Sequence, residues 1–224
     1  MKQSKKYAAS LALIEKGKAY SLTEAVALVK KTATTKFDGT IDISFNLNID
    51  TKQADQQLRG TIVLPHSNGK TKKILAITNK TEEATAAGAD YVGGKEMLQK
   101  IQSENWFDFD VIVATPDMMG ELGRMGRILG PKGLMPNPKT GTVSPDIASA
   151  IKEIKAGKIE YRADKEGNMH LSVAKASFAD DVIVDNLKAV IDTVLRIRPA
   201  SVKGVYIKNV VIHSVMGPSV KIAL

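Results

Sequence analysis

The sequence predicts two domains: an antiparallel α+β domain built from both ends of the chain, and an α/β domain inserted between them. Near both ends, strand-like segments alternate apolar and polar side chains, as strands do when one face of a sheet meets water. In the middle, short and wholly apolar segments alternate with helical ones, which is typical of a parallel sheet covered on both faces. We place the split domain at residues 1–66 and 158–224 and the inserted domain at residues 67–157.

The first part of the split domain is expected to contain two helices, the second over about residues 22–32. Ser21 and Glu24 form a capping-box pattern at its start. Residues 40–50 then alternate strictly between apolar and polar side chains, which predicts a strand with one wet face. Residues 58–65 are interpreted as its partner strand, ending at a proline that cannot donate to a ladder.

The inserted domain is predicted from three apolar strands, KILAIT, ADYVGG and DVIVATP, separated by helices at residues 81–88 and 96–101. A further helix is expected over residues 145–156, with Ser144 as its N-cap. The two crossings between the domains, HSNGK and KAGK, have the composition of exposed loops. They could act together as a hinge.

The alternating pattern returns at Ile159. Residues 159–163 and 169–173 are predicted to form a hairpin around a KEGN turn. A long helix is expected over residues 180–197, stopped by Pro199. Its apolar side chains recur at helical spacing at Val184, Leu187, Ile191, Val194 and Leu195. The last strand is predicted over residues 204–215, with a bulge near Val210 and Val211 where the apolar phase slips.

Composition narrows the function classes. The chain has 224 residues, of which 43% are apolar and 25% charged, as in globular domains. It has no cysteine, which excludes disulfides, thiolate metal sites and cysteine nucleophiles. No apolar run approaches the length of a membrane span, and the first 13 residues lack the apolar core of a leader. We therefore expect a cytoplasmic protein with no membrane partner.

The net charge of +8 favours polyanions, because binding them releases their condensed counterions. Lys and Arg outnumber Asp and Glu by 10 to 6 in residues 1–66, 13 to 11 in residues 67–159 and 9 to 7 in residues 160–224. Six of the eight excess charges therefore belong to the split domain. Nucleic acid leads the list of partners.

No catalytic or metal-binding motif is complete in this sequence. Gly69-Lys70-Thr71 resembles the end of a phosphate-binding loop, but the earlier glycine is missing and a strand follows. Asp108 and Asp110 precede a strand instead of following one. The three histidines, at positions 66, 170 and 213, share no ligand-like spacing. We expect no enzymatic activity, no metal and no cofactor.

Residues 123–143 form the most conspicuous segment, GRMGRILGPKGLMPNPKTGTV. Its glycines and prolines make one regular helix or strand improbable, and it carries four basic side chains, Arg124, Arg127, Lys132 and Lys139. It is interpreted either as a polyanion-binding loop or as an ordered surface loop with solvated charges.

A second group of residues flanks the strands of the split domain. Lys36, Phe37 and Thr40 precede the first strand, and residues 214–219 follow the last with Ser214, Met216, Gly217 and Ser219. An exposed aromatic beside lysine can stack on an unpaired RNA base, and glycine allows close approach of a backbone. The alternative is that Phe37 and Met216 cap a small core at the edge of the sheet.

The motif GRILGPKGLMPNPKTGTV, with KFDGTID and VMGPSVKI, resembles the bacterial type of the L-one family of large-subunit ribosomal proteins. The resemblance spans essentially the whole chain. It implies a split α+β domain and an inserted Rossmann-like domain joined by a hinge. It also implies three RNA partners besides the large subunit itself: the large-subunit (23S) ribosomal RNA of the mobile stalk, deacylated transfer RNA leaving the exit site, and the protein's own operon messenger RNA, whose translation it represses. We expect a monomer when the protein is free.

The resemblance places the main RNA surface on the split domain. By motif match it assigns RNA contacts to Lys36, Phe37, Thr40, Met216 and Gly217, and the hairpin pattern adds Arg162, Asp164, Lys165 and His170. The family usually has threonine where this chain has Val215, so either Ser214 supplies the hydroxyl or one contact is missing. The resemblance also gives residues 123–143 a secondary RNA or structural role.

Overall fold

The computed structural model describes residues 4–15 and 17–223, and its contacts divide the chain into two compact units. The split unit comprises Met1–Gly69 and Ile159–Leu224, and the inserted unit comprises Lys70–Lys158. Residues 1–3, 16 and 224 lie outside the described part.

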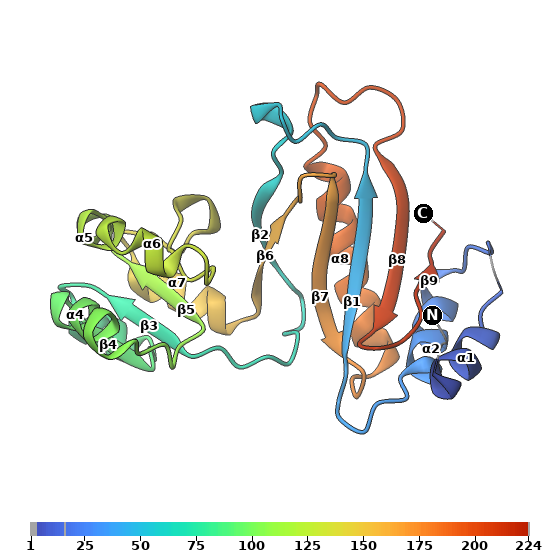
Figure 1. Ribbon diagram of the computed structural model, residues 1–224, viewed down its shortest axis with the longest axis horizontal. Coiled ribbons are helices and arrows are strands. Elements are labelled where there is room, and N and C mark those ends of the chain that lie inside the picture. Colours follow the sequence, from blue (N-terminus) through green and yellow to red (C-terminus); the bar gives the residue numbers. More distant parts are fainter. Residues whose placement is uncertain (1–3, 16, 224) are drawn as a thin grey trace. The chain divides into compact units, whose positions relative to one another are not determined.

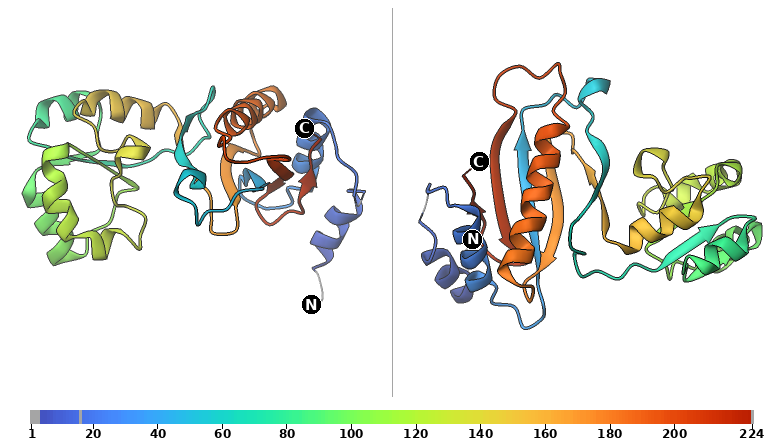
Figure 2. Two further views of the ribbon diagram at one scale, coloured as in Figure 1. Left: turned by 90° about the horizontal axis from the view of Figure 1, so that it is seen from above. Right: turned by 180° about the vertical axis from the view of Figure 1, so that it is seen from behind.

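The split unit is built on a four-stranded antiparallel sheet in the order β7-β1-β8-β9 (Figure 1). Its strands are β1 (Thr40–Leu47), β7 (Asn168–Lys175), β8 (Ile207–Ser214) and β9 (Val220–Lys221). Three helices accompany the sheet: α1 (Lys5–Ala12), α2 (Leu22–Thr32) and α8 (Asp180–Arg196). Helix α8 lies behind the sheet in Figure 1 and in front of it in the right-hand view of Figure 2, so it covers one face only.

Strand β1 shows why the sheet has one dry face. Ile41, Ile43 and Phe45 are almost fully buried, whereas Asp42 and Ser44 between them remain partly exposed. Successive side chains of a strand point to opposite faces, so the apolar set packs towards the helices and the polar set faces away from them. This confirms the predicted strand with one wet face.

The two main helices follow their sequence signals. Helix α2 begins with the predicted capping box, in which Ser21 accepts from the backbone N–H of Glu24 and Glu24 accepts from that of Ser21. Helix α8 buries Leu187 and Val194, but Leu195 is half exposed, so its assignment to the apolar stripe was wrong. Adjacent helical residues are rotated by about 100°, so Leu195 falls outside the face that contains Val194.

The predicted pairing of residues 58–65 with the first strand was wrong. Strand β2 (Arg59–Val63) pairs with β6 (Lys158–Arg162) in a separate two-stranded sheet. Strand β1 already uses both of its edges, one for β7 and one for β8, and has no edge left. A 3-10 turn, η1 (Ala54–Gln56), lies between β1 and β2.

The predicted hairpin of residues 159–173 also needs correction. The turn is present, but its two strands share only the isolated bridge between Ala163 and Met169. Beyond that bridge β6 pairs with β2 and β7 pairs with β1. Each strand therefore finds its neighbour far away in the sequence.

The predicted bulge of the last strand lies elsewhere. Asn46 and Leu47 of β1 face Asn209 and Ile207 of β8, which makes Lys208 the extra residue. Val210 is buried and Val211 is partly exposed, as expected for neighbours on opposite faces of an unbroken strand.

The inserted unit contains a parallel sheet of β4 (Tyr91–Gly93), β3 (Ile74–Ile77) and β5 (Val111–Ala114), in that order. All four residues of β3 are buried, because separate apolar clusters pack on its two faces. The predicted parallel sheet is therefore confirmed. The accompanying helices are α3 (Thr81–Ala86), α4 (Lys95–Glu104) and α7 (Ile147–Lys155).

Helix α7 is capped by Asp146 and not, as predicted, by Ser144. The Asp146 carboxylate accepts from the backbone N–H and the hydroxyl of Ser149. The Ser144 hydroxyl instead accepts from the backbone N–H of Asp146, before the helix begins. The segment before it is divided into short helical turns: η2 (Pro116–Met118), α5 (Met119–Arg124), α6 (Gly126–Leu129) and η3 (Pro138–Thr140). Among the described residues, no helix has the length and apolar character needed to cross a membrane.

Candidate nucleic-acid interface

Two large apolar side chains are exposed at one end of the main sheet. Phe37, just before β1, is 55% exposed, and Met216, just after β8, is 79% exposed. The sheet brings their loops together, because Ile41 pairs with Ser214 and the Val215 N–H donates to the Thr40 carbonyl at 3.0 Å. We call the group formed by Lys36, Phe37, Met216, Gly217 and Ser219 the loop cluster.

The backbone turn after β8 holds Met216 outward. The Gly217 N–H donates to the Ser214 carbonyl at 2.9 Å, which closes the turn. Met216 adopts a φ of 62°, a left-handed conformation that disfavours residues with a Cβ atom. A Cβ atom on Gly217 would lie 2.4 Å from the Ser214 hydroxyl oxygen, so only glycine fits there without movement.

Two residues assigned to RNA contact, Ser214 and Thr40, are buried. The Ser214 side chain is on the core side of β8, and its hydroxyl has no hydrogen-bond partner among the described residues. Val215 is partly exposed on the opposite side of the strand. Of the two alternatives raised by Val215, this geometry favours the missing contact, because Ser214 cannot reach that surface unless the turn rearranges.

The residues assigned from the hairpin pattern do not join the loop cluster. The Leu47 N–H donates to Gly167 and the Thr51 hydroxyl to the Lys165 carbonyl, which places this turn at the other end of β1. Eight residues of β1 separate the two ends by about 23 Å. Arg162 and Lys165 are exposed near the far end. His170 lies between, where its Nδ1 is 2.9 Å from the Ser44 hydroxyl.

Asp164 shapes that far turn. One of its carboxylate oxygens accepts from the N–H groups of Glu166 at 2.9 Å and Asn168 at 2.7 Å, and the other accepts from the Asn168 side-chain amide at 3.1 Å. Burial alone would raise the pKa of Asp164, but these hydrogen bonds outweigh it and hold the pKa below its ordinary value. The ionised carboxylate thus fixes the turn that presents Lys165.

The strand register reveals a polar surface that the sequence analysis missed. On the sheet face away from α8, Asp42 faces Ser172 and His213, Ser44 faces His170 and Val211, and Asn46 faces Asn168 and Asn209. We call these nine residues the open face. The alternation of residues 40–50 signalled polar positions on β1, but the partners on β7 and β8 required the register.

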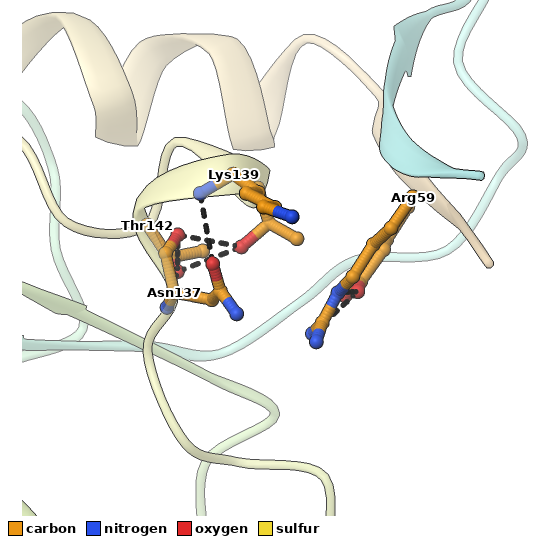
Figure 3. A network of polar contacts seen from close by, with 6 residues as sticks. Arg59, Asn137, Lys139 and Thr142 are labelled. Carbon is orange, nitrogen blue, oxygen red and sulfur yellow. Dashed lines mark hydrogen bonds and ion pairs between the residues drawn. The ribbon is translucent and has the colours of Figure 1, made fainter. Parts of the chain in front are cut away.

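The glycine-rich segment is internally ordered. Figure 3 shows the Asn137 side chain accepting from the Lys139 N–H, at 2.8 Å, and Thr142 accepting from the Asn137 N–H, also at 2.8 Å. The Lys132 ammonium lies 3.9 Å from the centre of the Phe107 ring. These contacts give residues 123–143 a defined shape and leave Arg127 and Lys139 exposed.

Within residues 4–15 and 17–223, no three His, Cys, Asp or Glu side chains come together as metal ligands. His66 lies next to Asn186 of α8, and His213 lies opposite Asp42 near the end of β8. The surfaces described above offer stacking, hydrogen bonding and positive charge.

Comparison with known proteins gives consistent matches. The model of the ribosomal protein L1p/L10e family matches residues 29–218. The large ribosomal subunit protein uL1 of Mycoplasma capricolum subsp. capricolum is 57% identical over 222 residues, 99% of this chain and 98% of the relative. The same-named protein of Mycoplasma mycoides subsp. mycoides is 56% identical over 99% of this chain and 98% of its own. The same-named protein of Mesoplasma florum is 56% identical over 100% of this chain and 99% of its own length.

Proposed function

Since the chain belongs to the ribosomal protein L1p/L10e family and is thus a non-enzymatic constituent of the large ribosomal subunit, we propose that it binds large-subunit ribosomal RNA through the loop cluster. The observation that carries this proposal is that Phe37 and Met216 are both exposed on adjoining loops at one end of the sheet. Single apolar side chains on a surface are ordinary, but two on adjoining loops, next to a lysine and a constrained glycine, make a stacking platform.

Each member of the loop cluster has a distinct part in this proposal. Phe37 stacks on an unpaired base, and Lys36 beside it neutralises phosphate. Gly217 lets the sugar-phosphate backbone come close, and the exposed Met216 supplies apolar contact. Thr40 and Ser214, being buried, support the two loops from below. Val215 lacks a hydroxyl, which removes one hydrogen bond and lowers affinity about fivefold.

We test the proposal by measuring binding of the purified full-length protein to the stalk-forming ribosomal RNA fragment of its own organism. A scrambled fragment of equal length is the control, and both are titrated across a salt series. We expect tight binding to the first fragment that survives moderate salt. Equal, weak binding to both fragments with a steep salt slope would mean that only the net charge of +8 acts.

Substitutions then locate the surface. Phe37→Ala and Met216→Asp should each weaken binding to the stalk fragment by about fivefold or more, because loss of a side chain in contact with a base costs roughly 1 to 3 kcal/mol. Lys139→Ala, in the inserted unit, serves as the comparison and should have a smaller effect. The reverse order in a filter-binding titration would refute the placement of the site.

The finer roles implied by the family resemblance are part of the same proposal. We propose that the protein works in the cytoplasm within the mobile ribosomal stalk, and that a hinge between its two units lets the stalk move deacylated transfer RNA out of the exit site. We also propose that the free monomer represses its own operon by binding a similar structure in the messenger RNA. Competition between the ribosomal and messenger fragments for one site would test this second use of the surface.

A further inference from the structure

The open face is a hydrogen-bonding surface almost without charge. Among its nine residues on β1, β7 and β8, Asp42 is the single ionic side chain outside the histidines, and β9 adds Lys221 at the edge, opposite Val211. The others include three asparagines and two serines. In Figure 1 this face looks towards the viewer, and no other described element of the split unit lies over it.

Some polar groups of the open face are hydrogen-bonded to one another, and others remain available to a ligand. Asn46 donates to Asn168 at 2.7 Å, and His170 is bonded to Ser44 through one ring nitrogen. The side chains of Asn209 and His213 make no hydrogen bond within the described part of the chain. Paired residues of neighbouring strands lie about 5 Å apart and same-face residues of one strand about 6.6 Å apart, so these donors and acceptors form a grid about 10 Å by 13 Å.

The position of the grid connects the two groups of cationic residues. The two ends of β1 are about 23 Å apart; Lys36 precedes one end and Lys165 lies near the other. A single RNA that touches both ends has to cross the open face. Since the face itself carries almost no positive charge, it cannot hold the RNA through phosphates and must use neutral groups.

The wide, shallow minor groove of an RNA double helix matches such a surface. It presents 2′-hydroxyl groups, each a donor and an acceptor, between flanking phosphate strands. Amide, hydroxyl and imidazole groups can bond these hydroxyls, while lysines at the two ends meet the phosphates. We propose that the open face binds the minor groove of an RNA double helix through 2′-hydroxyl contacts centred on Asn46, Asn209 and His213. This inference rests on the proposed RNA-binding function.

The experiment compares two forms of the ribosomal RNA fragment that the wild-type protein selects: all-ribose, and with 2′-deoxyribose throughout its double-helical stem. The variants are Asn209→Ala and His213→Ala, whose side chains have no bonds to lose. Gln102→Ala, an exposed neutral amide on α4 of the inserted unit, is the matched control. Thermal melts of all proteins verify folding before binding is measured.

Replacing ribose by 2′-deoxyribose in the stem should weaken binding of the wild-type protein to the fragment. Asn209→Ala and His213→Ala should each weaken binding to the all-ribose fragment by about 2- to 10-fold and leave binding to the deoxy fragment nearly unchanged. Gln102→Ala should bind each of the two fragments with the same affinity as the wild type. Equal losses on both fragments, or none on either, would overturn minor-groove recognition while leaving fragment-selective binding intact. Failure of the proposed function itself would show as loss of selectivity in the wild type.

Discussion

Met216 combines an exposed apolar side chain with a backbone conformation that disfavours it. Its φ of 62° costs on the order of 1 kcal/mol in a residue with a Cβ atom, and the side chain, 79% exposed, recovers little of this by packing. Such strain is commonly kept where a side chain serves binding. Met216→Gly should therefore raise the free energy of unfolding by about 1 kcal/mol and weaken RNA binding.

Urea unfolding at neutral pH and filter binding measure the two effects. Met216→Leu is the matched control, because it keeps both the strained backbone and an apolar side chain. Its stability and affinity should stay close to those of the wild type. A Met216→Gly protein that is less stable than the wild type would show that the strain is relieved elsewhere in the turn.

At the scale of the elements, local signals predicted which segments form helices and strands but not how the strands pair. The capping box at Ser21 and the alternation from Thr40 onwards act within a few residues, and both elements formed as expected. The partner of residues 58–65 depended on a competition for the edges of β1, which β7 and β8 win from more than 100 residues away. No local pattern reports such a competition.

The same distinction applies to the candidate site. The exposure of Phe37 and Met216 was one of two alternatives that the sequence left open, whereas the burial of Ser214 follows from its place in the alternation of β8. The open face could not be predicted, since its rows exist only once three strands are in register. The bulge predicted near Val210 also assigned side chains of β8 to the wrong faces of the sheet, because the extra residue is Lys208.

Helix α7 supplies a pH-dependent prediction. The Ser149 hydroxyl and then its backbone N–H stabilise the Asp146 carboxylate and lower its pKa from 3.8. A carboxyl group whose pKa is depressed on folding stabilises the protein above its ordinary pKa, and this stability is lost as the pH falls through the folded pKa. The melting temperature should therefore fall as the pH drops below about 4, because this contribution to stability is lost.

Asp146→Asn isolates the effect. Asparagine is also a good N-cap but does not titrate in this range, so the variant should fold at pH 7 and lose less stability on acidification. Scanning calorimetry between pH 6 and pH 3 gives the comparison. Identical pH dependence in both proteins would mean that the cap of α7 does not contribute to acid sensitivity.

Asn186 joins helix α8 to two other segments. Fully buried, it accepts from the His66 N–H at 3.0 Å and donates to the carbonyls of His66 and Val173 at 2.9 and 3.0 Å. Asn186→Ala leaves these groups without partners and should lower the free energy of unfolding by about 2 to 4 kcal/mol in urea titration. Leu195→Ala, on the same helix but half exposed, should cost much less. Equal losses would mean that α8 is held by its apolar face alone.

At the scale of the whole molecule, the distribution of charge matters more than its total. The split domain holds most of the net charge of +8, with Lys and Arg outnumbering Asp and Glu by 10 to 6 in residues 1–66 and 9 to 7 in residues 160–224. Both ends of the chain thus contribute to one basic domain. The inserted residues 67–159, with 13 against 11, are nearly balanced.

This asymmetry predicts a position-dependent salt effect. Lys36→Gln and Lys139→Gln lower the net charge equally, so any difference between them reports where RNA lies. If Lys36 contacts phosphate, its loss reduces the slope of log affinity against log salt by about 0.8, because one fewer counterion is released. Lys139→Gln should leave the slope unchanged. Equal slopes for the two variants in titrations between low and moderate salt would mean that the protein attracts RNA through its overall field and not through the proposed surface.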